Sequence, residues 1–257
     1  GTGNTFIGTA SGQLAKSGNS NVFLGAAAGY RNEANYNIFI GNYSGINNTI
    51  GTNNLFAGVF SGAYNRKGSN NIYLGNTAGF ADTIGNNNVF LGNGSGYSNQ
   101  ASNNIMIGFN SGFNSSSGNN NIFMGTETGV NNKGVSNIFF GFQSGYYNST
   151  GMQNTFLGTQ AGFSNTTGYN NIFLGTGAGQ FNTEGANNVF MGMQTGNKNT
   201  TGSLNTSLGY LAGFSNMTGN LNVFLGNMAG YYETGSNRLY ISNTTADKFN
   251  ALIYGEF

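Results

Sequence analysis

A repeat of 16 or 17 residues fills nearly the whole chain and constrains its fold more than any other feature. Each copy begins with Asn, a β-branched residue, Phe, an aliphatic residue and Gly. It continues with two variable residues, a small residue and a second Gly, and it ends in a polar segment. The leading asparagines are Asn4, Asn21, Asn37, Asn54, Asn71, Asn88, Asn104, Asn121, Asn137, Asn154, Asn171, Asn188, Asn205 and Asn222.

A unit of this length limits the fold class. Helical repeats need about 33 residues, so a pair of helices does not fit. One coil of a β-solenoid does fit, with two short strands, two tight turns and a rise of about 4.8 Å per coil. We therefore predict an all-β chain in which residues 1–235 form a parallel β-solenoid of about fourteen coils.

The predicted strand has apolar residues on both faces. Because successive strand residues point to opposite sides, Ile38 and Ile40 face one way and Phe39 the other. Strands that are apolar on both faces are normally buried on both. A coil this small encloses only one face, so we expect an identical chain to cover the other. We favour Phe inside the coil and the aliphatic pair between chains, and the reverse arrangement stays open.

Three further repeat positions can be explained by backbone geometry; we call the residues at one repeat position a column. The first Gly permits a positive φ or a close backbone approach at a corner, and the second marks a corner without room for a side chain. The leading Asn tolerates left-handed geometry and can form a ladder of amides between coils. The structural columns are represented by Asn37, Ile38, Phe39, Ile40, Gly41, Gly45, Asn171, Ile172, Phe173, Leu174, Gly175 and Gly179.

Charge is unusually scarce. Only 6% of the residues are charged, against about 25% in typical domains. A charged column would place like charges about 4.8 Å apart along the stack, and uniform stacking therefore explains the shortage. The basic and acidic residues are scattered singly, so we expect no nucleic-acid partner. No apolar run approaches the roughly 20 residues of a membrane span, so we expect no membrane insertion by this segment.

The sequence predicts that the segment is not an enzyme. It contains no His or Cys, and general acid–base chemistry needs groups within hydrogen-bond reach. Asp82 and Glu233 share a repeat column but lie nine coils apart, so they cannot act as a pair. We accordingly expect no catalytic residues, no metal site and no cofactor.

Two surface features have alternative interpretations. An aromatic column follows the second Gly, and we favour packing at a corner or between chains over a sticky surface for glycans; its members are Tyr30, Phe80, Tyr97, Phe113, Tyr146, Phe163, Phe214 and Tyr231. The triplets 148–150 and 165–167 match the glycosylation motif, which we attribute to chance in an Asn- and Thr-rich chain. We expect the polar stretch 165–168 to be an exposed turn.

The Asn–Ile–Phe–Leu–Gly strand followed by an Ala–Gly corner, as at residues 171–179, resembles the head repeat of trimeric autotransporter adhesins, and the resemblance covers residues 4 to about 235. The likeness is closer to tail-fibre-like repeat arrays of large secreted Bacteroidota proteins, whose ends are similar to residues 235–241 and 252–255. The resemblance implies a left-handed β-roll, a parallel homotrimer around an apolar axis, an extracellular or cell-surface location and a role in attachment. This unit is longer and has Phe in mid-strand where those heads have a small residue, so the number of chains stays open.

From these patterns we expect a structural or adhesive segment of an extracellular fibre. A tail fibre of a phage or a contractile injection machine is the alternative, and an ice- or glycan-binding solenoid ranks third because the Thr columns are broken. The chain opens inside a repeat, which favours a piece of a longer protein. Residues 236–257 hold Arg238, Asp247, Lys248 and Glu256, and we interpret them as a capping or junction segment.

Overall fold

The computed structural model describes residues 1–245 and 247–257, and every regular element in them is a β-strand. No helix is present in these residues that could cross a membrane. The chain divides into unit 1 (residues 1–127) and unit 2 (residues 128–257). Unit 1 contains β1 (Thr5–Ile7), β2 (Val22–Leu24), β3 (Ile38–Ile40), β4 (Leu55–Ala57), β5 (Ile72–Leu74), β6 (Val89–Leu91), β7 (Ile105–Ile107) and β8 (Ile122–Met124). Unit 2 contains β9 (Ile138–Phe140), β10 (Thr155–Leu157), β11 (Ile172–Leu174), β12 (Val189–Met191), β13 (Thr206–Leu208), β14 (Val223–Leu225), β15 (Arg238–Ile241) and β16 (Ile253–Glu256).

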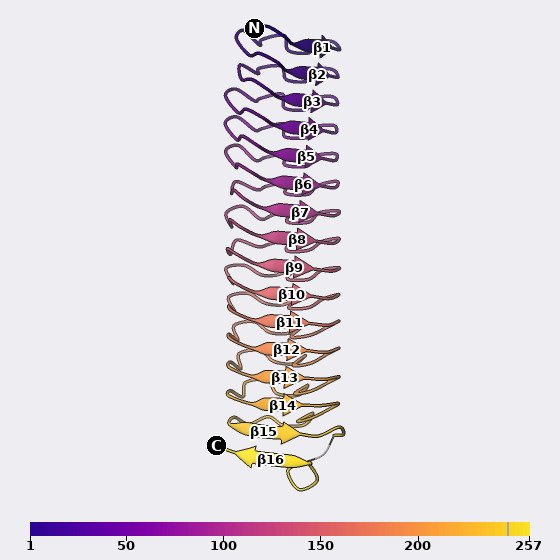
Figure 1. Ribbon diagram of the computed structural model, residues 1–257, viewed down its shortest axis with the longest axis vertical. Helices are drawn as coiled ribbons and strands as arrows, with labels where there is room; N and C mark the ends of the chain where they lie inside the picture. The colour runs from indigo at the N-terminus through magenta and orange to yellow at the C-terminus, as the bar shows by residue number, and fades with distance from the viewer. Residues whose placement is uncertain (246) are drawn as a thin grey trace. The chain divides into compact units, whose positions relative to one another are not determined.

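Within each unit, every strand up to β15 pairs in parallel with the next one along the chain (Figure 1). The register is constant from coil to coil, so that Phe39 pairs with Phe56 and Phe173 pairs with Phe190. The predicted parallel β-solenoid of about fourteen coils is therefore confirmed. We number the coils 1–14 after β1–β14, each beginning at its leading Asn.

Each coil has one strand, so the prediction of two strands per coil is wrong. The return path is a series of turns, in which Ser44 N–H donates to Gly41 O (3.2 Å) and Asn48 N–H donates to Gly45 O (3.0 Å). Tyr43 has a φ of 60° and Gly45 a φ of 56°, and alternating left-handed residues curl the backbone instead of pleating it. The turns still bond from coil to coil, as Gly45 N–H does to Ser61 O (2.9 Å).

The core of most coils is the aromatic side chain at the middle of the strand; β7 has Met106 and β13 has Ser207 at this position instead. Phe39 and Phe173 are fully buried, which confirms the arrangement with Phe inside. Neighbouring rings stack at the coil spacing: the Phe23 and Phe39 centroids are 5.0 Å apart, and those of Phe156 and Phe173 are 4.8 Å apart. Burying each ring contributes roughly 1.5–3 kcal/mol.

Both predicted glycine corners are confirmed. Gly41 has a φ of 122°, and an added Cβ would lie 2.6 Å from the carbonyl O of Gly58 in the next coil. Gly45 has a φ of 56°, and an added Cβ would lie 2.5 Å from Cε2 of Phe39. Gly175 and Gly179 repeat these conformations with φ values of 133° and 54°. The second Gly is thus required by the ring that it covers.

The leading asparagines lie inside the coil, but they are not left-handed. The positive φ belongs to the residue before them, such as Tyr36 (60°) and Asn170 (54°), and the strand begins at the residue directly after the Asn. The Asn37 Oδ1 accepts the Asn54 N–H (3.0 Å), and its Nδ2 donates to Gly51 O (2.9 Å). This column therefore joins side-chain amides to the backbone of the next coil.

A second buried Asn column forms the ladder between amides. Asn182 Nδ2 donates to Asn165 Oδ1 (2.7 Å), and Asn199 Nδ2 donates to Asn182 Oδ1 (2.7 Å). Each of these amides also donates to a glycine carbonyl of its own coil, as Asn182 does to Gly185 O (3.0 Å). Asn165 and Gly168 are buried and Thr166 is half-buried, so the expectation that residues 165–168 form an exposed turn is wrong for all but Thr167.

The last two strands end the parallel order. β15 pairs in parallel with β14, and β16 then runs antiparallel to β15. Arg238 Nη1 and Glu256 Oε1 form an ion pair across these two strands at 2.7 Å. The segment 236–257 thus adds one further parallel strand and covers it with a reversed one.

Candidate interaction surfaces

The outward side of the strands is mainly apolar, and its side chains are exposed or half-buried. We call the first and third strand positions of β1–β14 the strand face. Its exposed members keep 36–62% of their surface in solvent: Ile7, Ile38, Ile40, Ile72, Leu74, Ile105, Ile138, Phe140, Leu157, Ile172, Met191 and Leu208. Leu174 is half-buried. No charged residue occupies a strand-face position in any of the fourteen coils.

An open hollow adjoins the strand face in unit 2. It has a volume of about 690 Å³ and is lined by Phe140, Leu157, Thr159 and Thr176, with Gly141 and Gly158 at its base. The hollow exists because the corner glycines have no side chain and because the residues that follow Gly158 and Gly175 are the small Thr159 and Thr176. It could receive a side chain from another molecule that packs on the strand face.

Charges are placed elsewhere on the coil. Within residues 1–235, every charged residue except Glu127 lies in the polar segment that follows the second Gly: Lys16, Arg31, Glu33, Arg66, Lys67, Asp82, Lys133, Glu184, Lys198 and Glu233. The fold therefore separates an uncharged strand face from a charged edge. The sequence interpretation of singly scattered charges missed this separation, because it is visible only when the coils are superposed.

The predicted aromatic column is half-buried and stacked. Neighbouring centroids lie 4.9 Å apart for Phe80 and Tyr97 and 4.7 Å apart for Tyr97 and Phe113. The pairs Tyr146–Phe163 and Phe214–Tyr231 lie at 5.5 and 5.1 Å, and Tyr30 is half-buried in the same column. Stacked rings cover one another's faces and present their edges to solvent. This geometry favours the structural interpretation, since sugars bind to ring faces.

The polar groups of the motif triplets hold the coils together. Asn148 and Asn165 are fully buried within the amide ladder. Thr166 Oγ1 donates to Thr183 O (2.9 Å), and Thr183 Oγ1 donates to Thr200 O (3.0 Å). These side chains are structural here, which agrees with a chance match to the glycosylation motif.

Two acids, one buried and one half-buried, are each paired with a tyrosine that replaces the core Phe. Tyr73 in β5 donates its hydroxyl to Asp82 Oδ2 at 2.6 Å. Asp82 is fully buried, and its Oδ1 accepts the Gly85 N–H at 2.7 Å. Burial raises the pKa of the Asp82 carboxyl, and the hydrogen bonds from Tyr73 and Gly85 oppose this shift.

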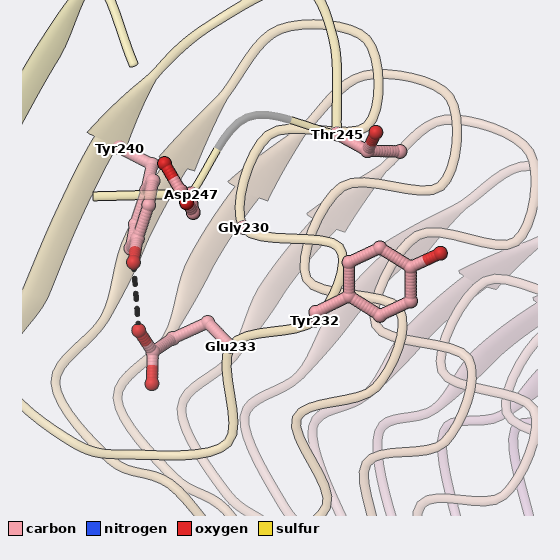
Figure 2. Close-up of a pocket in the computed structure, with 6 residues that line it drawn as sticks. All are labelled: Gly230, Tyr232, Glu233, Tyr240, Thr245 and Asp247. Atoms are coloured by element: carbon pink, nitrogen blue, oxygen red, sulfur yellow. Dashed lines mark hydrogen bonds between the residues drawn. The ribbon is translucent and has the colours of Figure 1, made fainter. Parts of the chain in front are cut away.

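The second pair lies near the end of unit 2. Figure 2 shows the Tyr240 hydroxyl pointing at Glu233, to whose Oε2 it donates at 2.9 Å. Burial is the main cause of the raised pKa of Tyr240, and the bond to Glu233 adds to it. The pair borders a hollow of about 130 Å³ that is also lined by Gly230, Tyr232, Thr245 and Asp247. Sequence reasoning placed Asp82 and Glu233 in one column but missed their partners, although Tyr at a strand centre was a usable signal.

The described residues contain no group of three or more acidic, His or Cys side chains that could hold a metal ion. The interaction surfaces are thus the strand face, the charged edge and the aromatic column. Comparison of the chain with protein-family models, with curated proteins and with solved structures gave no match.

Proposed function

We propose that this chain is a structural and adhesive segment of an extracellular homo-oligomeric fibre, which mediates attachment to cells or surfaces and has no catalytic role. The observation that carries the proposal is the strand face, which is apolar, free of charge and exposed in a single chain. Monomeric proteins rarely expose contiguous apolar patches larger than a few hundred Å². A partner that covers this face is therefore expected.

A second copy of the chain is the partner that fits best. The apolar side chains recur at every coil, and an identical chain in parallel orientation presents the same spacing along its whole length. A partner without the repeat would match this spacing at one or two coils only. The resemblance to adhesin heads implies three copies around a common axis, and we adopt the trimer as the expected number.

The energetics require several coils to act together. Covering one side chain that is about 40% exposed contributes roughly 1 kcal/mol. Association costs roughly 4–15 kcal/mol, so a single coil cannot hold two copies together, whereas the strand face of a whole unit can. Long repeat arrays are thus well suited to build a fibre from weak individual contacts.

The test compares two pairs of Ile-to-Lys substitutions in the same two coils. Ile38→Lys with Ile72→Lys places charge on the strand face, and Ile50→Lys with Ile84→Lys places it on exposed turn residues of coils 3 and 5. Mass photometry should show an oligomer for the parent chain and the control pair, and a monomer for the strand-face pair. A stable, soluble, folded monomer of the parent chain would contradict the proposal, as would equal effects of the two pairs.

A further inference from the structure

Four cations that are dispersed in the sequence lie along one edge of unit 1. Backbone hydrogen bonds join the polar segments of coils 1–4 in succession: Leu14 N–H to Tyr30 O (2.8 Å), Glu33 N–H to Thr49 O (3.0 Å) and Thr49 N–H to Arg66 O (3.1 Å). Three coil rises span about 14 Å. We call Lys16, Arg31, Arg66 and Lys67 the basic edge.

The basic edge is unpaired. All four side chains are exposed, and the ion pairs among the described residues involve Arg238 alone. Glu33 is the single acid in coils 1–4. The four cations less Glu33 give these coils a net charge of +3, whereas the whole chain has +1. Such a local excess of one sign attracts a polyanion.

A hollow of about 300 Å³ lies within this edge. Its lining combines an apolar side chain (Leu14), two cations (Lys16 and Arg31), a carboxylate (Glu33) and a hydroxyl (Thr49). Its volume is at the lower end of the range for small-molecule sites. An acidic sugar requires an apolar surface for its ring, acceptors for its hydroxyl groups and cations for its anionic group, and this hollow offers all three.

We propose that the basic edge binds an acidic polysaccharide. One sugar ring lies against Leu14 with its hydroxyls donating to Glu33, and its anionic group pairs with Lys16 or Arg31. Later anionic groups of the extended polymer pair with Arg66 and Lys67, and the guanidinium of Arg66 can bind a carboxylate or sulfate with two hydrogen bonds. This inference rests on the proposed function, because it supplies a ligand for the attachment that the fibre performs.

Glu33 distinguishes this ligand from a nucleic acid. A carboxylate among the cations repels a phosphodiester but accepts the hydroxyl groups of a sugar. Sites for single-stranded nucleic acid also place aromatic rings along the groove for base stacking, and no aromatic side chain lines the hollow. The observations therefore favour a polysaccharide over the other common polyanions.

Affinity electrophoresis of the full chain tests the proposal, with alginate in the gel as the acidic polysaccharide and dextran as the neutral control. Alginate should retard the parent chain, dextran should not, and salt should weaken the effect. Loss of one exposed cation should weaken binding roughly threefold, and Arg31→Gln with Arg66→Gln should weaken it about tenfold. The matched control is Lys133→Gln with Lys198→Gln, which removes two cations from the same repeat positions in unit 2 and should change binding less than about twofold.

Several outcomes would overturn the inference. These are the absence of retardation by alginate, an equal loss in the control pair, or tighter binding of duplex DNA or of anionic phospholipid vesicles than of alginate. Glu33→Gln should weaken alginate binding and strengthen DNA binding, and the opposite changes would also count against it. Mass photometry of the same samples tests the proposed fibre separately. A monomer that binds alginate would support the polysaccharide site and contradict the proposed oligomer.

Discussion

Replacing Asp82 by Asn should stabilise unit 1 at neutral pH, because Asp82 interrupts the amide ladder. In the regular ladder each Asn Nδ2 donates to the Oδ1 of the preceding coil, as Asn182 does to Asn165. Asp82 has no N–H to donate. Asn48 Oδ1 and both polar side-chain atoms of Asn65, in the two coils before it, are buried and have no hydrogen-bond partner among the described residues.

The size of the effect follows from these contacts. Asn at position 82 would donate to Asn65 Oδ1, and satisfying a buried acceptor is worth about 1–3 kcal/mol. The bond from Tyr73 would change from a charged to a neutral acceptor, which costs about 1 kcal/mol. The Gly85 N–H would also lose its acceptor, because Nδ2 takes the place of Oδ1, and this costs about 1 kcal/mol more. We therefore expect a net gain of about 1–2 kcal/mol in the free energy of unfolding, because the buried charge disappears as well.

The pH dependence provides a second observable. Burial raises the folded-state pKa of Asp82, so the folded chain binds more protons than the unfolded chain between the two pKa values. The stability contributed by the protonated group is complete below the unfolded pKa of about 4 and is lost as the pH rises through the folded pKa. The slope approaches about 1.4 kcal/mol per pH unit in that window.

Urea unfolding followed by far-ultraviolet circular dichroism, at about pH 4 and about pH 8, measures both effects. The parent chain should lose stability between these values by more than Asp82→Asn does. Tyr73→Phe should lower the stability by about 1.5–3 kcal/mol at the higher pH, since the buried carboxylate loses its shortest hydrogen bond. A destabilised Asp82→Asn variant, or one with the pH slope of the parent, would refute the reasoning.

Two further predictions concern the aromatic core and use the same unfolding assay. Gly179→Ala should lower the free energy of unfolding by roughly 3 kcal/mol or more, because its Cβ would lie 2.5 Å from the Phe173 ring. Gly177→Ala is the control: its φ is also positive (66°), but its nearest contact is at 3.4 Å, and it should lower the free energy of unfolding by about 1 kcal/mol. Equal losses in the two variants would contradict the steric explanation. Ser207→Phe should lower the free energy of unfolding by about 1–3 kcal/mol relative to Ser207→Ala, because the space beside Ser207 has no room for a water molecule and Phe224 already packs against Gly213. A gain would mean that Phe224 moves and frees the ring position of β13.

The fold was predictable because a single physical requirement selects the residue type at each repeated strand position. Alternation along residues 38–40 separates the ring from the aliphatic pair, and the buried ring in turn requires the glycine at position 45. The single strand per coil was not predictable. The residue two positions after the first Gly has a positive φ whatever its side chain, as Tyr43, Phe60 and Leu211 show, so residue type gives no signal of the turn.

The second Asn column could have been found from the sequence but was assigned to exposed turns. It recurs eleven residues after the leading Asn of each coil and is interrupted by Ala15, Asp82, Ser115 and Glu233. The buried unpartnered polar atoms of the described residues lie within two coils of an interruption: Asn48, Asn65, Ser115, Asn199 and Asn216. A hydrogen-bonded ladder fails locally where one member cannot donate, and composition alone does not reveal that.

The placement of charge bears on the proposed fibre. Repulsion between stacked like charges, taken alone, would remove charge from every outward column equally. Yet Arg66 and Lys67 are adjacent in one turn, and the same edge holds Lys16 and Arg31, so the polar segment tolerates like charges at the coil spacing. Repulsion along the stack therefore cannot account for a strand face without a single charge. The proposed burial against another copy would account for it, because an ion taken out of water costs several kcal/mol unless it is paired.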